Sequence, residues 1–284
     1  MTYIDAHHHV WDLSRRPQPW LEPPEMAPIR RDFTLSDHAS TAARAGIGKS
    51  VLVQVLPDAQ ETREFLASAA ETGTVAGVVG WADLTRPDLA DELAALAASP
   101  GGHLLRGIRH LVQGEPDPRW LTRDEVRRGL RQVAAAGLVY DLLVLPHQLP
   151  AAIETVRAVP ELNFVLDHLA KPPIASGELE PWAGLIGELA AEPNVTAKLS
   201  GLITEATWDD WDAVALKPYT AVALDAFGPE RLMFGSDWPV CLLAGSLPTW
   251  AETVRELLVH AGLSNAERDA VLGATAARTY RLDG

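Results

Sequence analysis

Apolar residues gather in eight short runs along the chain. Most of these runs are nearly continuous in Val, Ile, Leu and Ala and do not alternate with polar residues. Strands of a parallel sheet have this pattern because helices cover both faces of the sheet. The pattern therefore predicts eight buried strands, at residues 3–10, 50–56, 75–82, 104–112, 138–145, 163–169, 194–199 and 231–235.

Helical patterns separate these runs. We expect helices at residues 36–45, 59–71, 86–98, 122–136, 150–159, 179–191, 208–227 and 249–261, and a last one near 264–280. Ser36, Asp58, Thr122 and Ser264 are residue types that cap helix N-termini. Strand and helix thus alternate eight times, which predicts an α/β fold of the (β/α)8 TIM barrel type. We expect a single domain over residues 1–284, since no Gly/Ser linker divides the chain.

The end of the first run argues against an open sheet. A doubly wound sheet usually carries a glycine-rich turn after its first strand, whereas this run ends in His-His-His-Val-Trp at residues 7–11. The segment at 14–32 follows, and its prolines predict a long rigid loop. In a barrel, this loop would lie on the catalytic face.

Charge and cysteine content exclude several kinds of partner. Lys and Arg total 24 and Asp and Glu total 38, so the net charge is −14, and no Lys/Arg run is visible. Such a chain repels phosphate backbones, and we expect no nucleic-acid partner. No apolar run approaches the ~18 residues of a membrane span. Cys241 is the single cysteine, which excludes an internal disulfide and favours a cytoplasmic protein. The sequence leaves open whether the chain forms a homo-oligomer.

The first strand carries the strongest chemical signal. Side chains alternate along a strand, so one set should point into the barrel and the other toward the helices. The polar, inward set is Asp5, His7, His9 and Trp11, and the other set is Ile4, Ala6, His8 and Val10. His7 and His9 can coordinate one divalent cation. The alternative is that they are two core histidines with hydrogen bonds to other protein groups. We expect His8 to be structural.

Two further strands supply titratable groups at their carboxyl ends. Asp237 ends the eighth strand, because Pro239 cannot continue the hydrogen-bond ladder of the sheet. It should lie next to the first strand once the barrel closes, where a carboxylate can bind a metal or deprotonate a water. His168 ends the sixth strand. The alternatives are a loop or capping role for Asp237 and a structural role for His168.

Five motifs, in this order, resemble those of the amidohydrolase superfamily, and specifically its related lactonase group. The group includes lactonases of the L-fuconolactonase, L-rhamnonolactonase and 2-pyrone-4,6-dicarboxylate lactonase type. The motifs are Ile-Asp-Ala-His-His-His-Val-Trp at 4–11, Gly-Ile-Arg-His at 107–110, Leu-Asp-His-Leu-Ala-Lys-Pro at 166–172, Lys-Leu-Ser-Gly-Leu at 198–202 and Phe-Gly-Ser-Asp-Trp-Pro at 234–239.

The resemblance implies a metal centre and a set of catalytic roles. His7, His9, His168 and Asp237 would bind one divalent ion, for which Zn²⁺ is best suited. Asp237 would act as base and then acid, while His168 and Arg109 stabilise the oxyanion. Members with two metals carry a lysine on strand four, where this chain has Arg109 and His110, so a second metal is not expected. The group includes members that work without metal, so metal-independent catalysis stays open. Whether His147 is a metal ligand also stays open.

Other polar and aromatic residues at strand ends are candidate substrate contacts. Arg109 and Lys198 could hold a carboxylate or the lactone carbonyl, or could pair internally with Asp141 or Asp167. Hydroxyl-binding polar groups and tryptophan walls are typical of a small-molecule site. The predicted substrate-binding residues are Trp11, Gln54, Trp81, Asp83, His110, Lys198 and Trp238.

The sequence thus predicts a hydrolase that opens a small lactone, and we favour a neutral sugar-acid lactone over an anionic one. The nearest alternative is a superfamily decarboxylase or amide hydrolase acting on a small carboxylic acid. A non-catalytic small-molecule binder is a more distant one. Titratable residues that converge from strands one, four, six and eight argue against a binder, because a binder does not need a positioned base.

Overall fold

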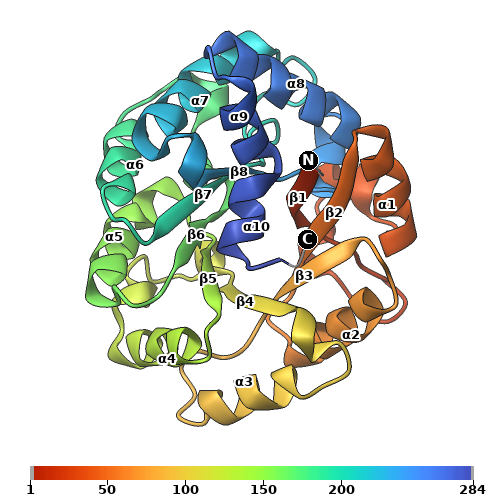
Figure 1. Ribbon diagram of the computed structural model, residues 1–284, viewed down its shortest axis with the longest axis vertical. Coiled ribbons are helices and arrows are strands. Elements are labelled where there is room, and N and C mark those ends of the chain that lie inside the picture. Colours follow the sequence, from red (N-terminus) through yellow and green to blue (C-terminus); the bar gives the residue numbers. More distant parts are fainter. Residues whose placement is uncertain (1–2, 283–284) are drawn as a thin grey trace.

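Eight parallel strands form one sheet in the order of the chain, β1 to β8. The structure is a computed structural model and describes residues 3–282. Figure 1 looks along the barrel, with the strands arranged around its centre and α10 crossing in front of it. The strands are β1 Tyr3–His8, β2 Ile47–Val53, β3 Val75–Gly80, β4 Leu105–His110, β5 Val139–Leu142, β6 Phe164–Leu166, β7 Val195–Leu199 and β8 Leu232–Phe234.

The sheet closes between its last and first strands. His8 forms a parallel bridge with Trp238. The backbone N–H of Asp237 donates to the carbonyl of His7 at 2.8 Å, and that of His9 donates to Trp238 at 2.7 Å. These bonds place the segment after β8 beside the end of β1. The predicted (β/α)8 barrel is confirmed.

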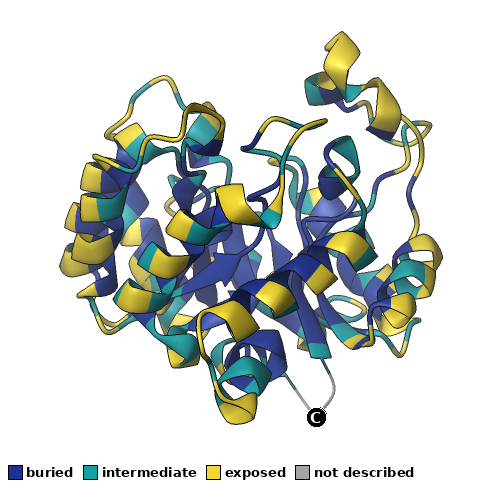
Figure 2. Cartoon of the chain, turned by 90° about the horizontal axis from the view of Figure 1, so that it is seen from above, coloured by how far each residue is buried: buried dark blue, intermediate teal, exposed yellow. Residues whose placement is uncertain are grey.

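Helices cover the outside of the barrel. Figure 2 shows buried strands inside and exposed residues on the outer faces of the helices. No helix in residues 3–282 is long and apolar enough to cross a membrane. The outer helices are α1 Leu35–Arg44, α2 Ala59–Ala70, α3 Leu89–Ala97, α4 Asp124–Ala135, α5 Leu149–Ala158, α6 Trp182–Ala190, α7 Ala213–Phe227 and α8 Leu247–His260.

The end of the chain covers the amino end of the barrel. The helix expected near 264–280 is divided into α9 Asn265–Asp269, a π-helical segment Ala270–Ala274 and α10 Thr275–Thr279. Tyr280 and Ala276 join the apolar cluster inside the barrel, with Ile4, Ala6, Val51, Val53, Val79, Val139, Val165 and Met233. The amino half of the interior is therefore apolar, and the polar groups lie toward the carboxyl ends of the strands.

A β-bulge in β1 changes which side chains point inward. Asp5 is paired with Ser50 and His8 with Leu52, so three steps on β1 oppose two on β2. The extra residue exchanges the two faces of the strand. Ile4 therefore lies in the barrel interior, whereas Asp5 accepts a hydrogen bond from His38 of α1 at 2.9 Å. The prediction that Asp5 faces inward with His7 is wrong, and so is the prediction that Ile4 and Ala6 point toward the helices.

Several element ends differ from the sequence prediction, and neither Ser36 nor Thr122 caps a helix, since α1 is capped by Thr34 and α4 begins at Asp124. Two of the differences have clear local reasons. The predicted strand at 163–169 ends at Leu166, because the chain then takes a left-handed turn with φ of 52°, 50°, 58° and 54° at residues 168–171. Positive φ is uncommon for non-glycine residues and concentrates at functional sites. The predicted helix at 208–227 begins at Ala213, because the carboxylate of Asp212 accepts the N–H of Ala215 and caps it there.

Candidate active site

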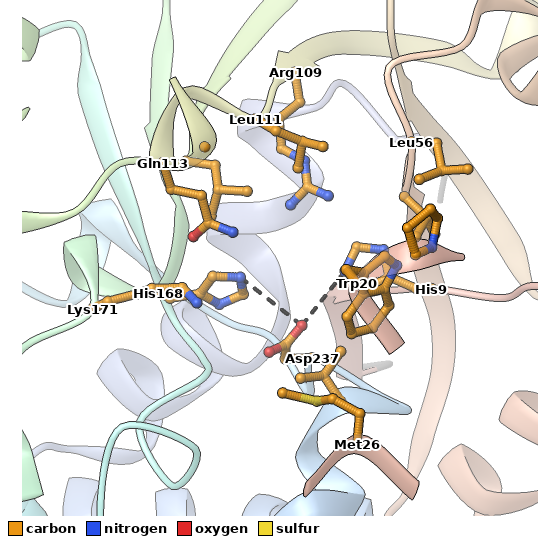
Figure 3. Close-up of a pocket in the computed structure, with 15 residues that line it drawn as sticks. His9, Trp20, Met26, Leu56, Arg109, Leu111, Gln113, His168, Lys171 and Asp237 are labelled. Atoms are coloured by element: carbon orange, nitrogen blue, oxygen red, sulfur yellow. Dashed lines mark ion pairs between the residues drawn. The ribbon is translucent and has the colours of Figure 1, made fainter. Parts of the chain in front are cut away.

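Four side chains predicted from the sequence meet at the carboxyl end of the barrel. Oδ1 of Asp237 lies 3.5 Å from Nε2 of His9, 3.8 Å from Nε2 of His7 and 3.9 Å from Nε2 of His168. All four side chains are buried. Figure 3 shows His9 and His168 on opposite sides of the Asp237 carboxylate. Three imidazole nitrogens thus surround one carboxylate oxygen.

Each imidazole is held through its other ring nitrogen. Nδ1 of His9 is 2.8 Å from the carbonyl of Val53. A carbonyl only accepts, so this nitrogen carries a hydrogen and Nε2 is the nitrogen that faces the centre. Nδ1 of His168 is 2.8 Å from the Ser200 hydroxyl. Such contacts fix the ring orientation and are typical of metal-binding histidines.

Burial and mutual contacts set the protonation states. Burial lowers the pKa of His168 to about 4 and holds the pKa of His7 well below its ordinary value. Burial alone would raise the pKa of Asp237, but His168, His9 and His7 outweigh it and keep that pKa below the ordinary range. At neutral pH, the group therefore contains an ionised carboxylate and neutral His7 and His168 rings.

This donor set fits a divalent metal ion. Ligand atoms of His7, His168 and Asp237 all lie within 4.8 Å of one another. Nε2 of His9 is 3.0 Å from Nε2 of His7. Two nitrogens this close repel each other unless one of them carries a hydrogen or both bind the same cation. Imidazole and carboxylate ligands suit Zn²⁺. A guanidinium nitrogen of Arg109 also lies 3.3 Å from Nε2 of His7, so the chain brings a positive charge of its own to this point.

Arg109 and Lys198 belong to a buried network of charges. Arg109 is 3.0 Å from Asp167, and two of its nitrogens donate to Oε1 of Gln54 at 2.8 and 3.1 Å. Lys198 is 2.5 Å from Asp141 and 2.9 Å from Asp167. Buried charges need such partners. The internal ion pairs that the sequence left open are therefore present.

A cavity of about 590 Å³ opens above this centre. His9, Arg109, His168 and Asp237 line its polar end. The segment at 14–32 does lie on this face of the barrel and contributes Pro19 to the lining. It also contributes Trp20 and Met26, which Figure 3 shows. The remaining lining residues are Val55, Leu56, Leu111, Gln113, Gly114, Leu143, Lys171 and Val240. The size and the mixture of apolar walls with a few polar groups fit a small molecule.

None of the seven predicted substrate-binding residues lines this cavity. Gln54 and Lys198 have no exposed surface, because they hold Arg109 and two carboxylates. Trp11 and Trp238 are buried against the Phe33 ring, with ring centres 5.4 and 5.2 Å apart. In this structure these four side chains are therefore buried against other protein groups and do not face the cavity.

The other three residues also contact protein groups. The indole of Trp81 donates to Nδ1 of His110 at 3.1 Å. His110 stacks on Trp120 and lies 2.7 Å from Glu115. Asp83 accepts the N–H and the hydroxyl of Thr85 at 2.9 and 2.7 Å, which closes a local turn. His147 is exposed and does not join the ligand group within residues 3–282.

The sequence reasoning missed several residues of the site. Trp20 and Met26 lie in two short 3-10 helices, Pro19–Leu21 and Pro24–Ile29, which no periodicity predicts. Lys171 lies in the quoted motif at 166–172, which was the available signal, and Asp167 was expected only as an internal ion-pair partner. Asp167 accepts from Arg109 and lies 3.2 Å from Nδ1 of His7, so it orients the histidine.

Glu61 of α2 supports one wall of the cavity. Its carboxylate accepts the backbone N–H groups of Val55 and Leu56 at 2.7 and 3.0 Å. Burial raises the pKa of Glu61 to about 7. A raised acid pKa contributes stability that is present below the unfolded-state pKa and lost as the pH rises through the folded-state pKa.

We therefore expect Glu61→Gln to gain stability relative to wild type as the pH rises. The amide keeps an acceptor but takes up no charge. The difference in the free energy of unfolding should change by up to about 3 kcal/mol between about pH 4.5 and 7.5. Urea denaturation at several pH values measures it. A difference that stays constant across this range would contradict the shifted pKa.

Comparison with known proteins identifies the family. The sequence model of the amidohydrolase family matches residues 4–282. An L-fucono-1,5-lactonase of Burkholderia ambifaria is 40% identical, covering 100% of this chain and 97% of the relative. Another from Burkholderia multivorans is 41% identical, covering 98% and 96%. A crystal structure of an amidohydrolase from Burkholderia multivorans with bound zinc has a TM-score of 0.93 at 38% identity and covers 100% of both chains. These matches confirm the resemblance of the five motifs, and the chain belongs to the amidohydrolase family.

Proposed function

We propose that the protein is a lactonase that hydrolyses a sugar-acid lactone, with L-fucono-1,5-lactone as the first candidate. The observation that carries the proposal is the Asp237 carboxylate, kept ionised among three imidazoles at the polar end of a cavity of small-molecule size. Relatives at 40% and 41% identity, each matched over nearly its full length, are L-fucono-1,5-lactonases and support the same reaction.

Asp237 is placed to act first as a base and then as an acid. Its carboxylate takes a proton from a water that attacks the lactone carbonyl, and the new C–O bond gives a tetrahedral oxyanion. Arg109 lines the cavity and places positive charge beside this oxyanion. The bond to the ring oxygen then breaks, and Asp237 returns the proton to that oxygen. The product is an open hydroxy acid.

His168 can serve this reaction in either of two tautomers. Its Nδ1 faces the Ser200 hydroxyl, which both donates and accepts. When the hydroxyl donates, Nε2 of His168 carries a hydrogen and can stabilise the oxyanion. When it accepts, Nε2 presents a lone pair and can bind a metal. Both roles predicted for His168 are therefore compatible with its contacts.

The cavity favours a neutral lactone. The two described cations that line it are already paired, Arg109 with Asp167 at 3.0 Å and Lys171 with Glu205 at 3.4 Å. An anionic substrate would have to share one of these cations with a carboxylate that it already neutralises, whereas a neutral lactone would not.

A pH-indicator screen tests the proposal, because lactone opening releases a proton. The panel should contain L-fucono-1,5-lactone, other aldonolactones, muconolactones and a pyrone dicarboxylate, with amides and aromatic acids for the two alternative reactions. We expect kcat/KM above about 10⁴ M⁻¹s⁻¹ on a neutral aldonolactone. Turnover of an amide or an aromatic acid without turnover of any lactone would overturn the proposal.

We further propose that His7, His9, His168 and Asp237 hold one Zn²⁺ or similar ion. When bound, such an ion polarises a carbonyl and lowers the pKa of a bound water. Elemental analysis of protein purified without chelator should find up to one equivalent per chain, and His9→Ala should lower that content. Full activity after exhaustive chelation, with no metal detected, would assign the protein to the metal-independent members.

Three expectations from the sequence stay predictions. These are a cytoplasmic location, one domain that extends to residues 1 and 284, and the absence of a nucleic-acid partner. The oligomeric state stays open.

A further inference from the structure

The polar groups that line the cavity mostly have protein partners. Arg109 contacts Gln54 and Asp167, His168 contacts Ser200, and Lys171 contacts Glu205. Gln113 is different. Its Oε1 is buried and has no hydrogen-bond partner within residues 3–282.

The backbone holds Gln113 firmly in place. It lies on a 3-10 turn, Val112–Gly114, directly after β4. Its N–H donates to the carbonyl of Leu143 at 3.0 Å, which ties this turn to the end of β5. Figure 3 shows the amide end of Gln113 turned toward the interior of the cavity. The side chain is thus presented to a ligand by a fixed backbone.

Oε1 of Gln113 is buried without a partner among the described residues, which costs free energy, and it has too little accessible surface to contact a ligand in the cavity. A ligand in the cavity reaches this amide through Nε2, which faces the interior in Figure 3 and can donate to a ring hydroxyl. In the wall made by Trp20, Met26 and Leu56, the indole N–H of Trp20 already donates to Oε1 of Gln18 at 2.9 Å, and the rest of the wall is apolar. A hydroxylated ring would therefore turn its hydroxyl toward Gln113.

We propose that the amide of Gln113 binds a ring hydroxyl of the lactone and is a specificity-determining residue for hydroxylated lactones. This inference rests on the proposed lactonase function. It assigns Gln113 to substrate recognition and leaves the acid–base chemistry to Asp237. The substrate class it selects is a polyhydroxylated lactone over an unsubstituted ring of the same size.

Gln113→Leu tests the proposal, because leucine keeps much of the volume and loses the amide. On an aldono-1,5-lactone, kcat/KM should fall about tenfold, mostly through a higher KM. On unsubstituted δ-valerolactone, the change should stay below about twofold, since that ring has no hydroxyl to lose. Gln113→Asn, which withdraws the amide by one methylene, should give a smaller loss, again on the hydroxylated lactone alone.

Gln132→Leu is the matched control. Gln132 lies on α4, away from the cavity, and its Oε1 is also buried without a partner. This variant should keep both activities. If the wild type opens no sugar lactone, the proposed function fails. If it does open one, but Gln113→Leu loses the same factor on both lactones or loses nothing, the role of Gln113 is overturned.

Discussion

Replacing Asp237 by asparagine should lower kcat on a sugar-acid lactone at least ~10²-fold while thermal unfolding stays almost unchanged. The amide has the shape of the carboxylate but cannot accept a proton from water. The backbone at residue 237 has φ of 54°, a conformation that asparagine tolerates better than most residues. The hydrogen bond from the backbone N–H of this residue to the carbonyl of His7 does not involve the side chain and should persist. The loss should therefore report on chemistry rather than on folding.

His8→Gln provides the opposite control. The His8 ring stacks on His38 of α1 with ring centres 3.7 Å apart, outside the barrel. This variant should reduce stability more than turnover. Thermal unfolding, metal content and kcat should be measured for both variants. If Asp237→Asn kept its fold and metal and more than about half of the wild-type kcat, Asp237 would have no place in the mechanism.

The barrel could be predicted because its signal is local and repeated. Each strand is a run of apolar residues, and eight such runs alternate with helices whatever their tertiary partners are. The ends of elements depend on single contacts, such as the cap at Asp212. The bulge in β1 could not be predicted, since nothing in Asp-Ala-His-His at residues 5–8 marks an extra residue and only the pairing with β2 reveals it.

The centre of the site was predictable for a related reason. His7, His168 and Asp237 each lie at the carboxyl end of a strand, and barrel closure brings those ends together. The substrate contacts were not predictable in the same way. A strand-end position places Gln54 and Lys198 near the site. It does not show whether their hydrogen bonds and ion pairs are already made to other protein groups, as they are here. Trp20 and Gln113 lie in a short 3-10 helix and a 3-10 turn, whose course depends on packing.

Lys198→Met should lower the free energy of unfolding by about 3–5 kcal/mol and reduce turnover of neutral and anionic lactones by the same factor. Lys198 has no exposed surface and contacts Asp141 and Asp167. Its removal leaves these buried carboxylates without their closest shared cation. Burial raises the pKa of Asp141 to about 6 even beside Lys198. Without Lys198 that pKa should rise further, so the destabilisation should be smaller near about pH 5 than near about pH 8.

A double variant separates the lost charge pair from a lost substrate contact. Lys198→Met with Asp141→Asn removes one charge of each sign and keeps an acceptor for the hydroxyl of Tyr280, which contacts Asp141 at 2.9 Å. It should recover much of the stability lost in the single variant, because a missing pair costs far less than an unpaired charge. Urea denaturation measures both. A single variant of unchanged stability that lost activity on anionic lactones alone would show instead that Lys198 reaches the substrate, and the preference for a neutral lactone would then be wrong.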